Sequence, residues 1–283
     1  MANAQHSGYY FAPPSKWPVV GSTALFFLAI GGVLLMNSHG IGMVPFGIGF
    51  FILVYMLFGW FGTVIRESEG GLFNGQVDLS FRWAMSWFIF SEVMFFAAFF
   101  GALWYARQYS IPWLSDLDNK LLWPDFAGQW PTAGPYRPPE FTPMHAWGIP
   151  AINTLLLLSS GVTVTWAHWA LKKGDRSNLI FGLFLTILLG IIFLSLQAYE
   201  YGHAYSELNL KMTTGVFGST FYMLTGFHGF HVTLGVTMLI VILFRCVAGH
   251  FKPDHHFGFE AVSWYWHFVD VVWLLLFIFV YWV

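Results

Sequence analysis

Long apolar stretches, almost free of charged residues, follow one another along most of the chain. An α-helix needs about 20 residues to cross the ~30 Å hydrocarbon core of a bilayer, whereas the strands of a membrane barrel show about 10 residues of alternating polarity. The stretches are too long and too uniformly apolar for such strands. They predict seven membrane-spanning helices, at residues 17–36, 41–65, 83–106, 146–171, 179–198, 212–244 and 261–283.

The composition agrees with this pattern. Of the 283 residues, 57% are hydrophobic and 9% are charged, whereas soluble domains contain about 25% charged residues. A net charge of −2 without a basic patch excludes a nucleic-acid-binding protein. The single cysteine, Cys246, excludes an intrachain disulfide and a cysteine-built metal site. The fold class expected is therefore an all-α integral membrane protein.

Basic residues at the helix ends predict the orientation, because short loops that are not translocated retain Lys and Arg. With the N-terminus inside, the two short outer loops carry only Lys211. The inner segments then hold Lys16, Arg66, Arg82, Lys172, Lys173, Arg176, Arg245 and Lys252. We expect the N-terminus inside and the C-terminus outside, and residues 1–16 show no pattern of a cleaved signal peptide.

No internal repeat divides the chain, so residues 1–283 are interpreted as a single membrane domain. The proline-rich outer segment 107–145 is expected to be an ordered loop with little helix. The glycine-containing inner connection 66–82 separates the first two helices from the other five. It is a candidate boundary between two sub-bundles, at residues 1–68 and 80–283.

Ionisable side chains inside the predicted spans are costly, so each is a candidate functional group. They are Glu92, His228, His231, His267 and Asp270. Glu92 and Asp270 each lie ten residues, roughly 15 Å, above a charged residue at the inner end of their helix. On its own helix Glu92 has only aromatic neighbours: Phe88, Phe95, Phe96 and Phe99. Either another helix supplies a hydrogen-bond donor, or the carboxyl stays neutral and able to exchange a proton.

Two pairs have a spacing that also occurs in metal sites: His228 with His231, and His267 with Asp270. Counted from the inner ends of their helices, the helical rise places the two pairs about 10 Å apart in depth. No further buried histidine is expected to complete a ligand set. We therefore expect no metal, and favour hydrogen bonds between helices or proton handling. A self-contained histidine metalloenzyme is the less favoured alternative.

Charged residues also gather where the helices end on the inner side. Arg66 and Glu67 end the second predicted helix, and Arg245 ends the sixth. Such charges commonly mark the membrane boundary, but a cluster of them can also bind phospholipid headgroups. The residues alone leave both interpretations open.

Six segments resemble, in the same order, subunit III of the haem-copper cytochrome c oxidases, and the resemblance runs from Trp17 to Trp282. They are "SEVMFF" (91–96), "INTLLLLSSGV" (152–162), "VTWAH" (164–168), "TGFHGFHV" (225–232), "HHFGFE" (255–260) and "WYWHFVDVVW" (264–273). The resemblance implies a subunit without redox cofactors, which stabilises the catalytic subunit, binds phospholipid and supports proton uptake during reduction of dioxygen to water. The partners implied are oxidase subunits I and II, with subunit I as the main contact and with haem and copper bound in the partners.

The resemblance also implies an arrangement of two plus five helices around a lipid-filled cleft. It makes Glu92 the candidate for proton handling. Lipid contacts carry over onto Trp60, Arg66, Glu67, Arg245 and His255. Gly62, Phe73 and Asn74 depart from the family pattern and leave headgroup contacts at the second helix open. A bacterial inner membrane is the expected location, and the equivalent subunit of a quinol or nitric-oxide-type oxidase is the alternative.

Overall fold

The computed structural model describes residue 10, residues 12–136 and residues 140–282. Within these residues the regular secondary structure is helical, apart from an isolated β-bridge between Lys252 and His255. Seven of the described helical stretches are long and apolar enough to span a membrane, which confirms the prediction of an all-α multi-pass membrane protein. Most of the segment predicted to lack a signal peptide, residues 1–9 and 11, lies outside the described residues.

The observed spans follow the predicted order but are mostly longer. The third begins at Gly75 rather than at 83, and the fifth continues to Ser206 rather than ending at 198. Each predicted stretch ended where polar residues begin. The helices continue past these residues, because a helix can extend beyond the hydrocarbon core into the headgroup region. The spans are Trp17–Met36, Gly40–Glu69, Gly75–Leu114, Ile149–Lys172, Arg176–Ser206, Val216–Ala248 and Phe257–Tyr281.

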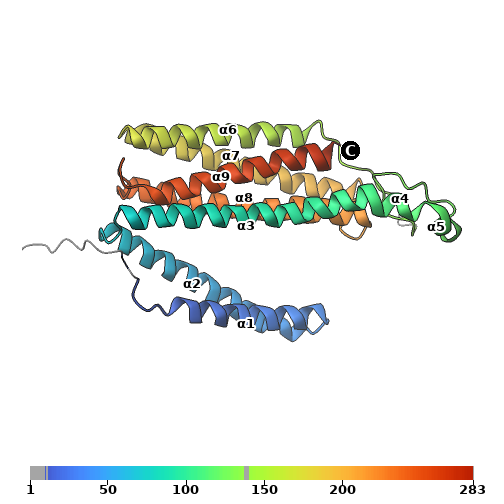
Figure 1. Ribbon diagram of the computed structural model, residues 1–283, viewed down its shortest axis with the longest axis horizontal. Coiled ribbons are helices and arrows are strands. Elements are labelled where there is room, and N and C mark those ends of the chain that lie inside the picture. The colour runs from blue at the N-terminus through green and yellow to red at the C-terminus, as the bar shows by residue number, and fades with distance from the viewer. Residues whose placement is uncertain (1–9, 11, 137–139, 283) are drawn as a thin grey trace, which may run out of the picture. The chain divides into compact units, whose positions relative to one another are not determined.

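The chain divides into two compact units, Met1–Phe81 and Arg82–Val283, and each is described by itself. The boundary falls inside α3 (Gly75–Tyr105). The first unit holds α1 (Trp17–Met36), the short 3₁₀ turn η1 (Gly40–Gly42) and α2 (Met43–Glu69) (Figure 1). The predicted sub-bundles and the lipid-filled cleft stay predictions.

The connection between α2 and α3 is shorter than the predicted segment 66–82, since only residues 70–74 are outside the two helices. Asn74 Oδ1 accepts hydrogen bonds from the backbone N–H groups of Gln76, at 3.1 Å, and Val77, at 3.0 Å. Capping of this kind satisfies N–H groups that have no partner within the helix. The polar residues of this segment therefore start a helix instead of forming an open loop.

Two glycines allow the backbones of α1 and α2 to touch. A Cβ atom on Gly31 would lie 2.5 Å from the backbone N of Phe46, and one on Gly49 would lie 2.6 Å from the backbone N of Leu28. Small residues at such crossings are typical of membrane helices, where close packing and not apolar burial drives association. The indole N–H of Trp17 also donates to Thr63 Oγ1, at 3.3 Å.

The second unit is a bundle in which α6 and α8 each pack on both α7 and α9, beside the remainder of α3 (Figure 1). The indole N–H of Trp266 donates to Ser160 Oγ at 2.9 Å, and that of Trp273 donates to Thr154 Oγ1 at 3.0 Å. These bonds join α6 to α9 within the apolar core. The four helices are α6 (Ile149–Lys172), α7 (Arg176–Ser206), α8 (Val216–Ala248) and α9 (Phe257–Leu276).

Short helices lie at the start of segment 107–145, contrary to the expectation of a loop. Pro112 lies in the first turn of one of them, where its missing N–H interrupts no helical hydrogen bond. The additional elements are the π-turn η2 (Ala106–Ser110), α4 (Ile111–Leu114), α5 (Leu117–Leu122) and, at the end of the last span, the π-turn η3 (Phe277–Tyr281).

The turn between α6 and α7 carries a helix cap outside the spans. Asp175 Oδ1 accepts a hydrogen bond from the backbone N–H of Asn178, at 3.1 Å. This bond lowers the pKa of the Asp175 carboxyl below its usual value, because it stabilises the ionised form. Asp175 thereby fixes where α7 begins.

The close crossing of α1 and α2 predicts that Gly31→Val destabilises the first unit. The added side chain would collide with the backbone of α2, and such overpacking costs about 1–3 kcal/mol. Gly32→Val is the matched control, because a Cβ at Gly32 has nothing within 4 Å. Unfolding of the chain in mixed micelles of increasing SDS content measures the difference. Equal stability of the two variants would contradict the assigned role of Gly31.

Candidate functional site

A carboxyl and an imidazole meet near the middle of two spanning helices. Glu92 Oε2 of α3 lies 2.9 Å from His231 Nε2 of α8. His231 Nδ1 lies 2.6 Å from the backbone oxygen of Phe227. A carbonyl oxygen only accepts hydrogen bonds, so Nδ1 carries a hydrogen and donates it. Glu92 Oε2 and His231 Nε2 then share one proton, in either an ion pair or a neutral pair.

Aromatic rings surround this pair. The His231 ring lies 5.0 Å from that of Phe96 and stacks on Tyr265 at 6.4 Å, measured between ring centroids. The His231 side chain is 9% exposed, whereas that of Glu92 is 22% exposed. The histidine is therefore enclosed, while the carboxyl reaches the surface of the second unit. His231 is the partner of Glu92 that the sequence left open.

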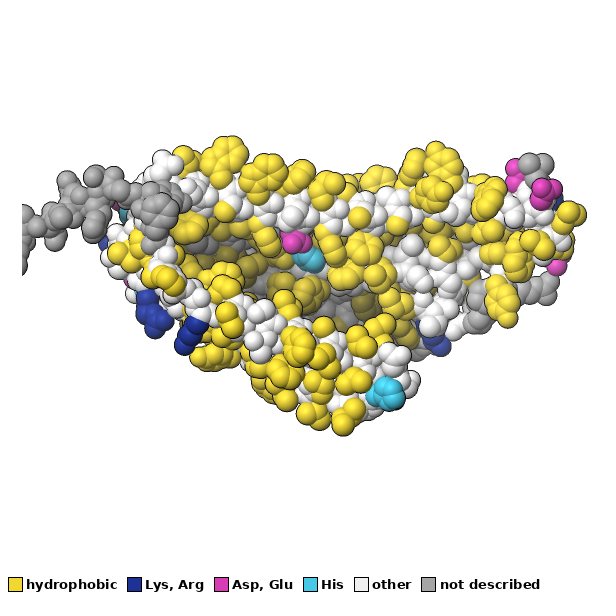
Figure 2. All heavy atoms as spheres, turned by 60° about the horizontal axis from the view of Figure 1, so that its bottom comes forward, with side chains coloured by type: hydrophobic (Ala, Val, Ile, Leu, Met, Phe, Trp, Pro, Cys, Tyr) yellow, Lys and Arg dark blue, Asp and Glu magenta, His cyan; other side chains and the backbone are white. Residues whose placement is uncertain are grey.

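The setting of such a pair is predominantly apolar. Figure 2 shows hydrophobic side chains over most of the visible face, with charged side chains mainly toward its ends. Near the middle, acidic and histidine side chains lie next to each other. A charge in such surroundings is stable only when a partner is close.

The other predicted pair, His267 and Asp270, lies between α9 and α6. His267 Nδ1 is 3.6 Å from Asp270 Oδ2. The hydroxyl of Thr165 donates to the backbone oxygen of Gly161, so it accepts the hydrogen of His267 Nε2, at 3.1 Å. Asp270 is buried, but the His267 side chain is 44% exposed and not buried as expected. Gly161 makes room for this carboxylate, because a Cβ at that position would collide with Asp270 Oδ2.

His228 has partners other than the Glu92 pair. Its Nε2 donates to the backbone oxygen of Val269, at 3.2 Å, and its ring lies between those of Phe193 and Trp273. His228, His231 and His267 thus bond to α9, α3 and α6 respectively. The two ligand-like pairs do not converge on one point.

The depth estimate for the histidines was wrong. It placed the His228 pair about 10 Å from the His267 pair by helical rise, yet His228 bonds to the backbone of Val269, between His267 and Asp270. The estimate assumed that the inner ends of both helices lie at one level and that the helices run parallel. The observed contacts exclude that combination of assumptions.

One buried carboxyl was missed because its predicted span ended too early. Glu200 lies on α7 and is 1% exposed. A signal for it exists, because the buried residues Phe193, Gln197, Glu200 and Ala204 follow one another at helical spacing. Continuing the apolar face past residue 198 would have placed Glu200 in the core.

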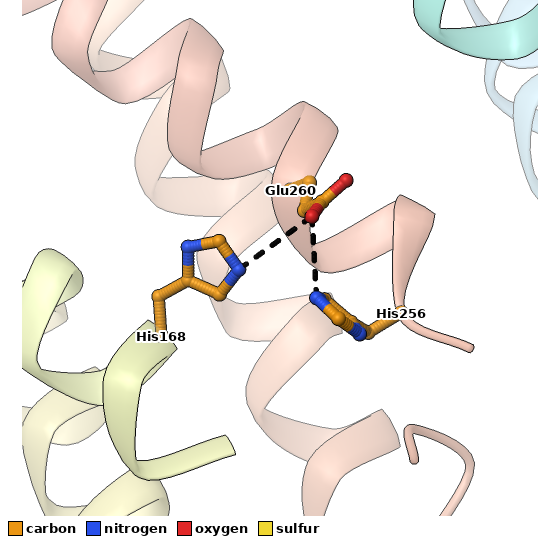
Figure 3. A group of neighbouring side chains, drawn as sticks. All are labelled: His168, His256 and Glu260. Carbon is orange, nitrogen blue, oxygen red and sulfur yellow. Dashed lines mark ion pairs between the residues drawn. The ribbon is translucent and has the colours of Figure 1, made fainter. Parts of the chain in front are cut away.

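A second missed group lies where α6 ends and α9 begins (Figure 3). The guanidinium of Arg82 donates to Glu260 Oε2 from Nη2, at 2.7 Å, and from Nε, at 3.1 Å. The other oxygen, Oε1, lies 3.2 Å from His256 Nε2 and 3.8 Å from His168 Nε2. His256 is buried. We had expected no further buried histidine that could complete a ligand set. The spacing of His256 and Glu260, four residues apart, could have indicated a shared helical face.

The comparisons with known proteins cover essentially the whole chain. The model of the family "Cytochrome c oxidase subunit III" matches residues 6–283. This chain belongs to the cytochrome c oxidase subunit III family. The resemblance seen in the sequence is thereby confirmed, and with it a respiratory, membrane-spanning subunit.

Three relatives named cytochrome c oxidase subunit 3 match this chain over nearly its full length. Cytochrome c oxidase subunit 3 of Chondrus crispus is 41% identical over 281 residues, which cover 99% of this chain and 95% of the relative. That of Marchantia polymorpha is 40% identical, with 100% and 98% covered. That of Danio rerio is 41% identical, with 100% and 99% covered.

The residues that the subunit III resemblance assigns to lipid lie on both units. On α2, Trp60 is exposed and stacks on Phe61, Arg66 donates to Thr63 Oγ1 at 3.3 Å, and Glu67 follows in the last turn. In the second unit, the Arg245 guanidinium lies 4.4 Å from the centroid of the Phe251 ring, and His255 is exposed. Each set has polar groups at a helix end, and the lipid assignment stays a prediction.

The Glu92 and His231 geometry predicts an energetic coupling between the two side chains. In a double-mutant cycle with Glu92→Leu and His231→Phe, each single variant leaves an unpaired polar group. The double variant should therefore lose less unfolding free energy than the two single variants lose together. Coupling energies between membrane helices are about 0.6 kcal/mol on average and about 1.7 at most, and we expect a value in that range. SDS-induced unfolding measures it. A cycle of Glu92→Leu with Thr237→Val, whose hydroxyl bonds only its own helix, should be additive; additivity in the first cycle would contradict the pair.

Proposed function

We propose that this chain is the non-redox third subunit of a respiratory cytochrome c oxidase, and that Glu92 and His231 assist proton uptake while the complex reduces dioxygen to water. Family membership supports the first part. The observation that carries the second is the 2.9 Å contact between Glu92 Oε2 and His231 Nε2, in the middle of α3 and α8. In this proposal subunits I and II hold the haem and copper, and this chain holds no redox centre. The chain contacts mainly subunit I and stabilises it.

A proton held between the two side chains supports this role. When it leaves, Glu92 Oε2 and His231 Nε2 are two hydrogen-bond acceptors 2.9 Å apart. Two facing acceptors in an apolar setting are unfavourable unless a hydrogen lies between them. The Glu92 side chain is 22% exposed at the surface of the second unit, and the proposed exchange requires water or a proton-carrying group to reach that surface.

Assembly and location follow from the relatives and from the charge pattern. The relatives' names describe them as oxidase subunits, which supports assembly of this chain with other subunits. The basic residues favour an N-terminus inside and a C-terminus outside. The relatives named above come from eukaryotes, so they do not favour the expected bacterial inner membrane over an organellar one.

Replacing Glu92 should separate proton handling from packing. Glu92→Gln keeps the size of the side chain and a hydrogen-bond donor for His231, so we expect normal assembly but slower proton uptake and fewer turnovers before inactivation. Stopped-flow measurements with a pH-indicator dye on the assembled oxidase test this. Glu140→Gln, on the exposed outer segment, is the control. Uptake and lifetime equal to those of the unaltered complex would leave only a packing role.

We also propose that Arg245 binds a phospholipid headgroup. Its cationic group lies over the Phe251 ring at the end of α8, which is the level at which anionic headgroups gather. Arg245→Ala should therefore lower the phospholipid that co-purifies with the oxidase, measured by mass spectrometry, and Arg245→Lys should restore part of it. Lys173→Ala, at the end of α6, is the matched control. Unchanged lipid content in Arg245→Ala would remove this assignment.

A further inference from the structure

Three potential metal ligands converge where α6 ends and α9 begins. His168 lies in the last two turns of α6, His256 directly precedes α9, and Glu260 lies in its first turn. His168 Nε2, His256 Nε2 and a Glu260 oxygen all lie within 4.8 Å of one another. Among the described residues this is the only group of three or more such ligands found together. Figure 3 shows both imidazole rings directed toward the carboxylate.

The hydrogen atoms of this cluster can be assigned in part. His256 Nδ1 lies 3.1 Å from the backbone oxygen of Lys252 and must donate to it, because a carbonyl only accepts. In the neutral ring, His256 Nε2 therefore presents a lone pair. On the other side Glu260 Oε2 already accepts two hydrogen bonds from Arg82, which leaves Oε1 to face the imidazoles.

The two Nε2 atoms are close to this oxygen but are not hydrogen-bonded to it. Both are buried and have no hydrogen-bond partner among the described residues, although His256 Nε2 is only 3.2 Å from Glu260 Oε1. Buried polar atoms are nearly always satisfied, so such an exception requires an explanation. A cation between the three atoms would satisfy all of them, whereas one proton on one line would satisfy only two.

We propose that His168, His256 and Glu260 form a site for a divalent transition-metal ion, most suitably Zn²⁺. Two imidazoles and one carboxylate form a ligand set that binds Zn²⁺, with a water molecule as the fourth ligand. Ligands about 2.0–2.2 Å from a tetrahedral ion lie roughly 3.3–3.6 Å apart, and the distances of 3.2 and 3.8 Å lie close to that spacing. We expected no metal because His228, His231 and His267 were not expected to form a ligand set. The proposal departs from that expectation, because it uses His168 and His256.

The surroundings of the cluster are those of a metal site. Imidazole ligands commonly donate their second N–H to a backbone carbonyl, as His256 does to Lys252, and ligating carboxylates are themselves hydrogen-bonded, as Glu260 is by Arg82. Arg82 pairs with the Glu260 oxygen that faces away from the imidazoles. Magnesium and calcium are disfavoured, because they prefer oxygen ligands.

Zinc binding to the assembled oxidase tests the proposal. The complex is treated with a chelator and titrated with Zn²⁺, and bound zinc is counted by mass spectrometry of the metal. We expect the unaltered complex to bind one more zinc ion than complexes with His168→Asn or Glu260→Gln, or to bind it at least about tenfold more tightly. Only assembled complexes are compared, and assembly is checked by the ratio of the subunits and by the absorption of the haems. His168→Asn leaves the Arg82 and Glu260 pair intact, so it separates ligand loss from instability.

His255→Asn is the matched control, because His255 is adjacent to His256 but exposed and outside the cluster. It should bind zinc as the unaltered complex does. X-ray diffraction at the zinc absorption edge should show an anomalous peak between the three side chains. Equal zinc content and affinity in the unaltered, His168→Asn and Glu260→Gln complexes, or an anomalous peak only elsewhere, would overturn the proposal.

Discussion

Polar groups between the spanning helices must find their partners inside the protein, because hydrocarbon offers none. Several polar groups of the second unit meet this constraint with single hydrogen bonds that cross between helices. Trp266 and Trp273 bond to hydroxyls on α6, His228 to a carbonyl on α9, and His231 to a carboxyl on α3. Each of these bonds specifies the rotation and the height of one helix against its neighbour. The same bonds that stabilise the bundle therefore also position its proton-bearing groups.

The helices themselves could be predicted from sequence, because the length of an apolar run is a local property. The seven runs identified the spans, and Glu92 and Asp270 were recognised as unusual from position alone. The ends were less predictable: α3 and α7 extend beyond their apolar runs, and α4 forms in a segment where proline was expected to prevent helix. A local pattern cannot show how far a helix extends into the headgroup region.

The partners could not be predicted, because they depend on how helices cross. Glu92 and His231 are 139 residues apart in the sequence. Measuring height along each helix separately placed His228 at the wrong depth relative to the helix that carries Val269. The cluster of His168, His256 and Glu260 was missed for the same reason. His168 lies near the end of α6, whereas His256 directly precedes α9, far away in the sequence. Spacing within one helix is visible in a sequence, whereas convergence of two helices is not.

The contact between Gly161 and Asp270 has a consequence for how this chain can vary. The carboxylate occupies the volume in which a side chain at position 161 would lie. A larger residue there would displace the buried Asp270 carboxyl and would also disturb the backbone oxygen to which Thr165 is bonded. The two positions are therefore one packing unit made from two helices. In related chains, a side chain at position 161 should occur only together with a smaller or uncharged residue at position 270.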